Sequence, residues 1–420
     1  MNFAFIKRNY HITTFILLYL SLLFGFYNNE STTFGPKIDF EHALKQVKLF
    51  DENFIYTFLN YDKIESPTRI SPLFILVIFL FKKIFINIDL VRFILLNILI
   101  LNQFLFYKCL KEIFHKKFKI EKKILFLISC VILISPSFRS NIIWPESAML
   151  GLLFFLLSLY FFLKNLNKPN KFNIFFNIFF LAIASYIRPS FCVFSIFFFY
   201  KYLTNHITQK FIIQIILVNL LLAFPAVYYV FFLDINFIKF SAGDLNFNIF
   251  NKISIISSII FFHMLPLIFY KKNFLYLKFK SRDITLAVLI IFVSIFCALN
   301  FDYDIDKAGG GIFLHISKFF FNNNILFFFS IPIFLYIIFK FAYFEKIENS
   351  IIFLLLFLLT PQYHIFHKYY DPLVLIIGFT ILNLGIKKDF FSNKINIFFL
   401  FGFYVSYYFI SWINYYYIKL

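Results

Sequence analysis

The acidic side chains that follow the first apolar segment are the strongest candidates for chemistry. In the stretch FGPKIDFEHALKQV, Asp39 is followed closely by Glu41 and His42. If a helix begins near Asp39, then Asp39 and His42 are three residues apart and share one face. A carboxylate in that position can act as a general base, a role that requires hydrogen-bond reach and a suitable pKa. Asp39 could instead be a helix N-cap, because aspartate is a favoured capping residue.

Basic side chains come next, in short segments between apolar runs. The stretch NYDKIESPTRISPLF carries Asp62, Lys63, Glu65 and Arg69 just before Pro72. Arginine can bind a phosphate through two N–H groups and lysine as a point charge. Both can also be anchors whose charged ends extend to the membrane surface. The other basic candidates are Arg92 in DLVRFILL, Arg139 in SPSFRSNIIWPESAML and Arg188 in SYIRPSF.

Two late segments are also rich in polar groups. TPQYHIFHKYYDPL holds His367, Lys368 and Asp371 among tyrosines, and interfacial anchoring explains the tyrosines but not these three. FDYDIDKAGGG has alternating aspartates but lacks the glycine and glutamate positions of an EF-hand loop. We therefore expect a flexible outer loop there. His364 and His367 lack the further ligands of a zinc site, so no metal site is predicted.

The composition shows what kind of element must hold these side chains. The chain has 420 residues, of which 61% are hydrophobic, 24% aromatic and only 15% charged. Soluble domains are usually about 45–50% apolar and about 25% charged. Disordered chains are poor in aromatic and hydrophobic residues, so disorder is excluded as well. The composition predicts an all-α polytopic membrane protein.

Apolar segments of spanning length fill most of the chain. A spanning helix needs about 20 mostly apolar residues, and on this criterion we expect about twelve to fourteen spans. No soluble block or Gly/Ser linker separates them, so a single membrane-embedded domain over residues 1–420 is predicted. The spans centre on 12–27, 71–87, 90–107, 124–137, 148–163, 173–187, 190–203, 211–233, 252–270, 284–300, 324–343, 350–365, 372–386 and 395–416.

The basic residues predict which loops face the cytoplasm. The net charge is +19, and Lys and Arg cluster between spans, as the positive-inside rule describes; nucleic-acid binding is not expected. With Lys7 and Arg8 inside, the first helix is expected to stay uncleaved. One conflict follows, because two full crossings after the 28–70 loop would place the basic stretch 108–123 outside. Either 71–87, which contains Lys82 and Lys83, crosses incompletely or one segment is miscounted. The predicted cytoplasmic loops are 108–123, 164–171, 271–282 and 387–394.

The 28–70 loop is predicted to lie outside and to carry juxtamembrane helices. It is the least apolar part of the chain and is rich in acids. An amphipathic helix, or two, on the membrane surface would explain its pattern, and so would an ordinary surface helix. Its apolar residues recur at steps of three and four at Ala43, Val47, Phe50, Phe54 and Phe58.

Taken in order, these motifs resemble the GT-C-type polytopic glycosyltransferases, which use polyprenyl-phosphate sugars and include the protein O-mannosyltransferase and aminoarabinose transferase branches. IDFEHALKQV resembles the acidic motif that opens the first outer loop of the family. YDKIESPTRISPLF with LVRFILL resembles its Tyr-acid-basic-Pro motif and downstream Val-Arg. SPSFRSNIIWPESAML and SYIRPSF resemble its paired outer turns, and QYHIFHKYYDPL its late Arg-Tyr-x-x-Pro segment. The resemblance spans about residues 10–205 and 355–385.

The chain departs from the family pattern at three places. Phe40 separates Asp39 from Glu41 where the family commonly has Asp-Glu. Pro67 and Pro72 replace a double proline, and Glu146 stands where aspartate is common. Asp39 remains the preferred base, with Glu41 as its competitor.

The resemblance implies an inverting hexosyl- or pentosyl-transferase of cell-envelope glycan biosynthesis. Its active site would face outward from the cytoplasmic (inner) membrane, and Asp39 or Glu41 would deprotonate a hydroxyl of a glycan, lipid or protein acceptor. Some relatives bind a divalent metal, and no ligand set here decides whether this chain does. We expect Arg69 first among the cations that stabilise the leaving lipid phosphate. The implied substrate-binding residues are His42, Asp62, Lys63, Arg69, Arg92, Arg139, Arg188, His367 and Lys368.

Two other classes of membrane protein compete with this interpretation. An O-antigen-type polymerase usually carries its large Arg-bearing outer loop late in the chain, whereas the large loop here is early and acidic. A secondary transporter would predict repeated halves and broken helices around ionisable residues at mid-membrane. The sequence contains no Walker A, GxGxxG, GxSxG or HExxH pattern, so a nucleotide-driven pump or a soluble-type hydrolase is not indicated.

Overall fold

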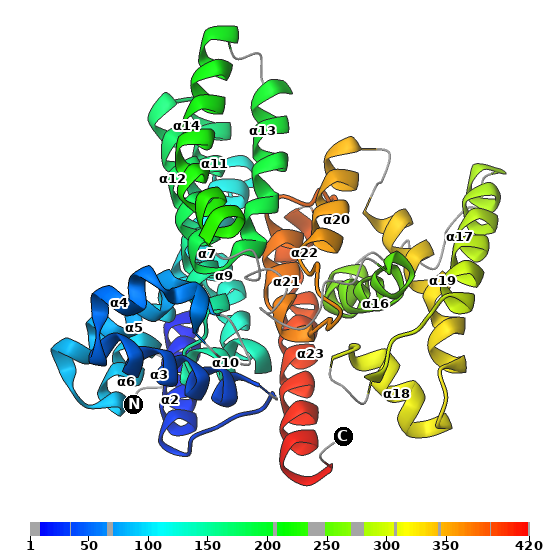
Figure 1. Cartoon of the computed structure of the whole chain (residues 1–420). Coiled ribbons are helices and arrows are strands. Elements are labelled where there is room, and N and C mark those ends of the chain that lie inside the picture. The colour runs from blue at the N-terminus through cyan, green and yellow to red at the C-terminus, as the bar shows by residue number, and fades with distance from the viewer. Residues whose placement is uncertain are drawn as a thin grey trace. The chain divides into compact units, whose positions relative to one another are not determined.

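The computed structural model is all-helical in the part of the chain that it describes (Figure 1), which confirms the predicted fold class. The described residues are 9–33, 35–64, 70–204, 208–233, 248–269, 281–305, 309–342, 346–386 and 388–418. They form two compact units. The first unit comprises Met1–Ala242 and Tyr404–Lys419, and the second comprises Gly243–Phe403.

The first unit contains α2 (Tyr10–Tyr27), α3 (Pro36–Glu52), α4 (Phe54–Leu59), η1 (Tyr61–Lys63), α5 (Pro72–Phe85), α6 (Ile88–Leu99), α7 (Leu101–Leu110), η2 (Lys111–His115), α8 (Lys116–Phe118), α9 (Lys122–Ser129), η3 (Cys130–Leu133), α10 (Pro136–Ile143), α11 (Ser147–Asn167), α12 (Lys171–Ile187), η4 (Pro189–Val193), α13 (Phe194–Thr204), α14 (Gln209–Tyr228) and η5 (Tyr229–Leu233). The second contains α16 (Ile249–Ile268), α17 (Ser281–Leu299), α18 (Ile312–Phe321), α19 (Ile325–Phe341), α20 (Ile347–Leu358), η8 (His367–Tyr369), α21 (Leu373–Phe379) and α22 (Lys388–Ser392). Helix α23 (Lys394–Ile413) begins in the second unit and ends in the first. It is followed in the first unit by η9 (Asn414–Ile418).

Proline and asparagine determine where many of these helices begin. Pro36 and Pro72 occupy the first turns of α3 and α5, where the missing N–H costs no hydrogen bond. Asn87, Asn170 and Asn248 are the N-caps of α6, α12 and α16, and the side-chain oxygen of each accepts backbone N–H bonds. The helix starts are therefore encoded locally.

Six helices in the described part of the chain are long and apolar enough to cross a membrane, or seven if one bent pair counts as a span. The chain is therefore an integral membrane protein, but these spans are fewer than the twelve to fourteen predicted. Several predicted spans are apolar helices of 10–17 residues, such as Lys171–Ile187 and Ile325–Phe341. The long spans are Tyr10–Tyr27, Ile88–Phe118, Ser147–Asn167, Gln209–Phe232, Ile249–Ile268 and Lys394–Tyr417.

The segment that caused the sidedness conflict is one of the short helices. α5 has 14 residues and ends with Lys82 and Lys83 in its last turn. Such a helix is about 21 Å long, at about 1.5 Å per residue, and the hydrocarbon core is about 30 Å thick. The length of α5 thus favours the incomplete crossing that the sequence left open.

The predicted amphipathic helix forms, with one change. In α3 the side chains of Ala43, Val47 and Phe50 are buried, as the three- and four-residue steps predict. The stripe ends at Asn53, which caps the separate helix α4 by accepting a bond from the Tyr56 N–H at 3.0 Å. Phe58, beyond this break, is exposed. α3 packs against α5 of the same unit, so its buried face contacts protein.

The predicted span 124–137 is broken instead of continuous. The helical stretches Lys122–Leu133 and Pro136–Ile143 meet at an angle of 69°. Ser135 lies at the bend, and its hydroxyl accepts the Phe138 N–H at 3.2 Å. Pro136 cannot donate to the preceding turn, so the first helix ends and α10 starts in a new direction.

Candidate functional site

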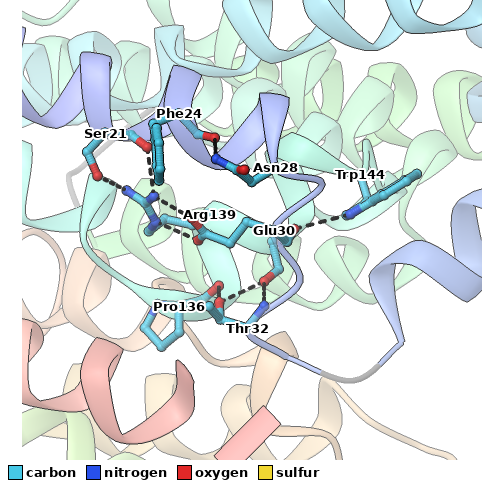
Figure 2. Close-up of polar contacts among 9 residues, drawn as sticks. Ser21, Phe24, Asn28, Glu30, Thr32, Pro136, Arg139 and Trp144 are labelled. Carbon is cyan, nitrogen blue, oxygen red and sulfur yellow. Dashed lines mark hydrogen bonds and ion pairs between the residues drawn. The ribbon is translucent and has the colours of Figure 1, made fainter. Parts of the chain in front are cut away.

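The first unit contains a buried ion pair between α10 and the connection that follows α2. Arg139 donates from Nε to Glu30 Oε1 at 2.9 Å and from Nη2 to Glu30 Oε2 at 2.8 Å (Figure 2). Both side chains are less than a tenth exposed. This two-bond arrangement is the strong form of an arginine–carboxylate contact.

Further contacts fasten the same connection to α10. Arg139 also donates to the Ser21 hydroxyl at 3.2 Å and to the Ser21 carbonyl at 3.1 Å. The indole N–H of Trp144 donates to the Glu30 carbonyl at 3.2 Å, and the Thr32 N–H donates to the Ser140 hydroxyl at 2.9 Å (Figure 2). The Arg139 guanidinium lies 4.8 Å from the Tyr408 ring centroid. These contacts pair Arg139, Glu30 and Thr32 with groups of α2, α10 and Trp144.

Arg92 of α6 holds the other side of Trp144. Its guanidinium carbon lies 3.6 Å from the Trp144 ring centroid, which is a cation–π contact. Arg92 donates to Asp89 Oδ1 at 2.9 Å and to Asn29 Oδ1 at 3.2 Å. It also donates to the Ile143 carbonyl at 3.3 Å. Arg92 and Arg139 are thus both occupied by protein partners.

Trp144 connects this cluster to the helix that carries the acidic motif. Its ring centroid lies 6.2 Å from that of Phe40, and the Lys37 ammonium lies 5.4 Å from the Trp144 centroid. Phe40 and Lys37 flank Asp39 in the first turns of α3. The structure brings the helix of the acidic motif, Arg92 and Arg139 into one region of the first unit through Trp144, a residue that the prediction did not include.

Asp39 lies in the first turn of α3 and is not its cap. The N-cap is Gly35, with φ of 111°, so the interpretation of Asp39 as a cap is wrong. The helix does place Asp39 and His42 three residues apart on one face, as expected. Asp39 is partly exposed and Glu41 is exposed. His42 is partly exposed too, and its Nδ1 is buried with no hydrogen-bond partner among the described residues.

Two of the remaining basic candidates of the first unit, Lys63 and Arg188, are described. Lys63 is exposed and donates to Asn60 Oδ1 at 2.8 Å. Arg188 is the C-cap of α12, and a Cβ added to Gly151 of α11 would lie 2.9 Å from its Cβ, so the two backbones pack closely. For Asp62 only the backbone, within η1, is described. Glu65, Pro67 and Arg69 lie outside the described residues.

The second unit contains a histidine cluster that the sequence revealed only in part. His263 of α16 and His367 of η8 face each other with their Nε2 atoms 2.8 Å apart. His315 of α18 is near, with Nε2 2.9 Å from the Gly309 carbonyl. A hydrogen bond between two imidazole nitrogens needs one donor and one acceptor, so one of the two Nε2 atoms carries a hydrogen and the other accepts it. Burial and the neighbouring His315 lower the pKa of His367 to about 3.

Lys368, predicted to contact a phosphate, is buried beside this cluster. Its ammonium lies 5.6 Å from the Phe366 ring centroid and 5.7 Å from that of Tyr369. Only 7% of the residue is exposed. In this arrangement its charge is directed at aromatic rings of its own segment.

The aspartate–glycine loop is packed against the late polar segment. Asp302 accepts bonds from the side-chain amides of Asn248 and Asn251, so its carboxylate serves as a connection within the second unit. A Cβ on Gly309 would lie 2.6 Å from the Ile365 carbonyl oxygen, and Gly310 donates to that carbonyl at 3.0 Å. The described glycines therefore permit close packing of this loop against Ile365. Asp306 lies outside the described residues.

Among the described residues, no group of three His, Cys, Asp or Glu side chains is placed to hold a metal ion.

Comparisons with known proteins add no relative to this description. No protein-family model, no curated protein and no solved structure matches the chain significantly.

Proposed function

We propose that this chain is a membrane glycosyltransferase that transfers a sugar from a polyprenyl-phosphate donor to an acceptor hydroxyl. The observation that carries the proposal is the position of Asp39. It lies partly exposed in the first turn of α3, and the flanking Phe40 is packed against Trp144 in the buried cluster. A general base must be reachable by substrate and held in place, and Asp39 meets both conditions.

The proposed transfer reaction needs no base other than Asp39. The acceptor hydroxyl attacks the anomeric carbon of the sugar while the bond from that carbon to the lipid-phosphate oxygen breaks. The hydroxyl proton passes to the Asp39 carboxylate, and the lipid phosphate leaves with the bonding electron pair. Attack opposite to the leaving group inverts the anomeric centre.

Arg92 and Arg139 act in this proposal as positioning residues. Their N–H groups are bound to Asp89, Asn29 and Glu30, so a phosphate would have to displace protein partners to reach them. The leaving phosphate would instead be met by Lys63 or Arg69, which follow α4 in the chain. Lys37, which the sequence interpretation passed over, is exposed beside Asp39 and is a further cation for this role.

The test is transfer of radiolabelled sugar from a panel of polyprenyl-phosphate donors in membranes that contain the wild type, Asp39→Asn or Glu41→Gln. Loss of a general base lowers the rate about 10²–10⁴-fold, and we expect that loss for Asp39→Asn alone. Glu41→Gln is the matched control, because it removes an equal charge two residues away. The opposite pattern would identify Glu41 as the base. Absence of transfer by the wild type with every donor would refute the proposal.

The hydrogen-bonded pair of His263 and His367 favours a second candidate, a proton-coupled secondary transporter. His263 lies in a helix of spanning length and is fully buried, and ionisable pairs at membrane depth often form proton relays. This candidate predicts that a pH gradient drives solute uptake into proteoliposomes and that His367→Gln abolishes the coupling. Sugar transfer that continues unchanged in His367→Gln would favour the transferase.

A further inference from the structure

The second unit contains an apolar cavity formed by four helices. Its volume is about 410 Å³, and it lies among α16, α17, α19 and α20. Twelve of its fourteen lining residues are apolar, and the other two are Ser257 and Ser350. The cavity is separate from the histidine cluster, none of whose residues lines it.

The cavity opens on a side of the helices that carries exposed apolar side chains. Leu289 and Leu354 both line it, and each is 58% exposed. Phe292 and Val288, on the same helix as Leu289, are exposed as well. In an integral membrane protein, hydrocarbon is the medium that suits such a surface. Water gains few hydrogen bonds in an apolar cavity, so filling by hydrocarbon is favoured over filling by water.

The size of the cavity specifies what length of hydrocarbon it can hold. An engineered apolar cavity of about 150 Å³ accommodates one benzene molecule, so about 410 Å³ accommodates roughly sixteen carbon atoms. That is one fatty acyl chain. A polyprenyl tail has several times as many carbon atoms and would leave most of its length outside.

Charged side chains lie near one end of the cavity. Lys340 pairs with Asp283, and Lys340 directly follows the lining residue Phe339. Asp283 lies one turn before the lining residue Leu286. Lys346 is the N-cap of α20, one turn before Ser350. An apolar cavity that ends beside lysines matches a molecule with a hydrocarbon chain and a phosphate at one end.

We propose that this cavity binds one acyl chain of a membrane phospholipid whose phosphate lies beside Lys346, at the exposed start of α20. The assignment does not depend on the proposed enzymatic function. It identifies a lipid site in the second unit, distinct from any site that takes a sugar donor.

The test is photolabelling of the full chain in nanodiscs by a phosphatidylethanolamine with a diazirine at mid-chain. We expect labelling of α17 and α20 at the residues that line the cavity. Leu289→Trp fills the mouth from an exposed position, so it should keep the fold and reduce this labelling roughly tenfold, as overfilling a site does. Ile291→Trp is the matched control, because Ile291 is 52% exposed on the same helix and does not line the cavity.

Two further labelling experiments identify the lipid that the cavity binds. Lys346→Gln should weaken labelling by the phospholipid and leave labelling by a diazirine diacylglycerol, which has no phosphate, unchanged. Excess unlabelled phosphatidylethanolamine should compete, and excess polyprenyl phosphate should not. The proposal fails if labelling is uniform over α17 and indifferent to Leu289→Trp. It fails equally if polyprenyl phosphate competes better than phosphatidylethanolamine.

Discussion

At the scale of residues, the ion pair of Glu30 and Arg139 has the largest expected effect on stability. Removing one partner of a buried pair leaves the other charge uncompensated, which typically costs about 3–5 kcal/mol. We therefore expect Glu30→Gln to lower the free energy of unfolding by about that amount, measured by denaturation in detergent. Asp51→Asn is the control, since its pair with Lys82 is partly exposed and such pairs contribute about 0–1 kcal/mol. Equal losses in the two variants would refute the structural role of Arg139.

A glycine beside this pair gives a second prediction. A Cβ on Gly25 would lie 2.3 Å from Glu30 Oε2, so Gly25→Ala should push the carboxylate away from Arg139. We expect lower thermal stability. Gly402→Ala is the matched control, because nothing lies within 4 Å of the added Cβ there, and alanine in a helix is favoured over glycine by about 1 kcal/mol. A loss of stability in both variants would point to helix packing in general.

His367 should make the stability of the chain depend on pH. Its pKa is lowered to about 3 by burial and by His315, whereas an unfolded histidine titrates near 6.5. Between these values the unfolded chain binds more protons than the folded chain. Stability is therefore fully present above about pH 6.5 and falls as the pH decreases toward 3. His367→Phe should flatten this decline in thermal unfolding scans, and Phe366→Leu should retain it.

At the scale of elements, α5 gives a prediction about topology. A 14-residue helix is too short to cross the hydrocarbon core, so both of its flanks should lie on the same side of the membrane. Single cysteines at Lys63 and Ile86, in a chain without its four native cysteines, should both react with a membrane-impermeant maleimide, or both resist it, in intact cells. Reaction of only one would show that α5 crosses.

Helix boundaries were predictable where they depend on local residues. The predicted span 12–27 became α2 (Tyr10–Tyr27), and 148–163 became α11 (Ser147–Asn167). The alternative of Asp39 as a cap is wrong because Gly35 and Pro36 start the helix one turn earlier, a signal present in the sequence. The continuous span 124–137 was wrong because Ser135 and Pro136 start a new helix. For that span, hydropathy was given more weight than the capping signal.

At the scale of the whole molecule, the contacts that build the two clusters could not be predicted. Glu30 and Arg139 are separated by 109 residues, and His263 and His367 by 104. One sequence does not show which distant polar residues meet. It did show that charged residues in apolar surroundings need partners. Glu30 and His263 were missed because each stands outside the motifs, and Trp144 was not singled out within SPSFRSNIIWPESAML.

The contacts of Trp144 make its fluorescence sensitive to the packing of α3. The chain has only two tryptophans, Trp144 and Trp412, so Trp412→Phe leaves a single emitter. That indole is 8% exposed and lies between Phe40 on α3 and the Arg92 guanidinium. Any process that lifts α3 from the first unit would expose the ring to water and move its fluorescence to longer wavelength. In purified Trp412→Phe protein reconstituted in nanodiscs, the emission of Trp144 would therefore report whether α3 is attached to the first unit, without an added label.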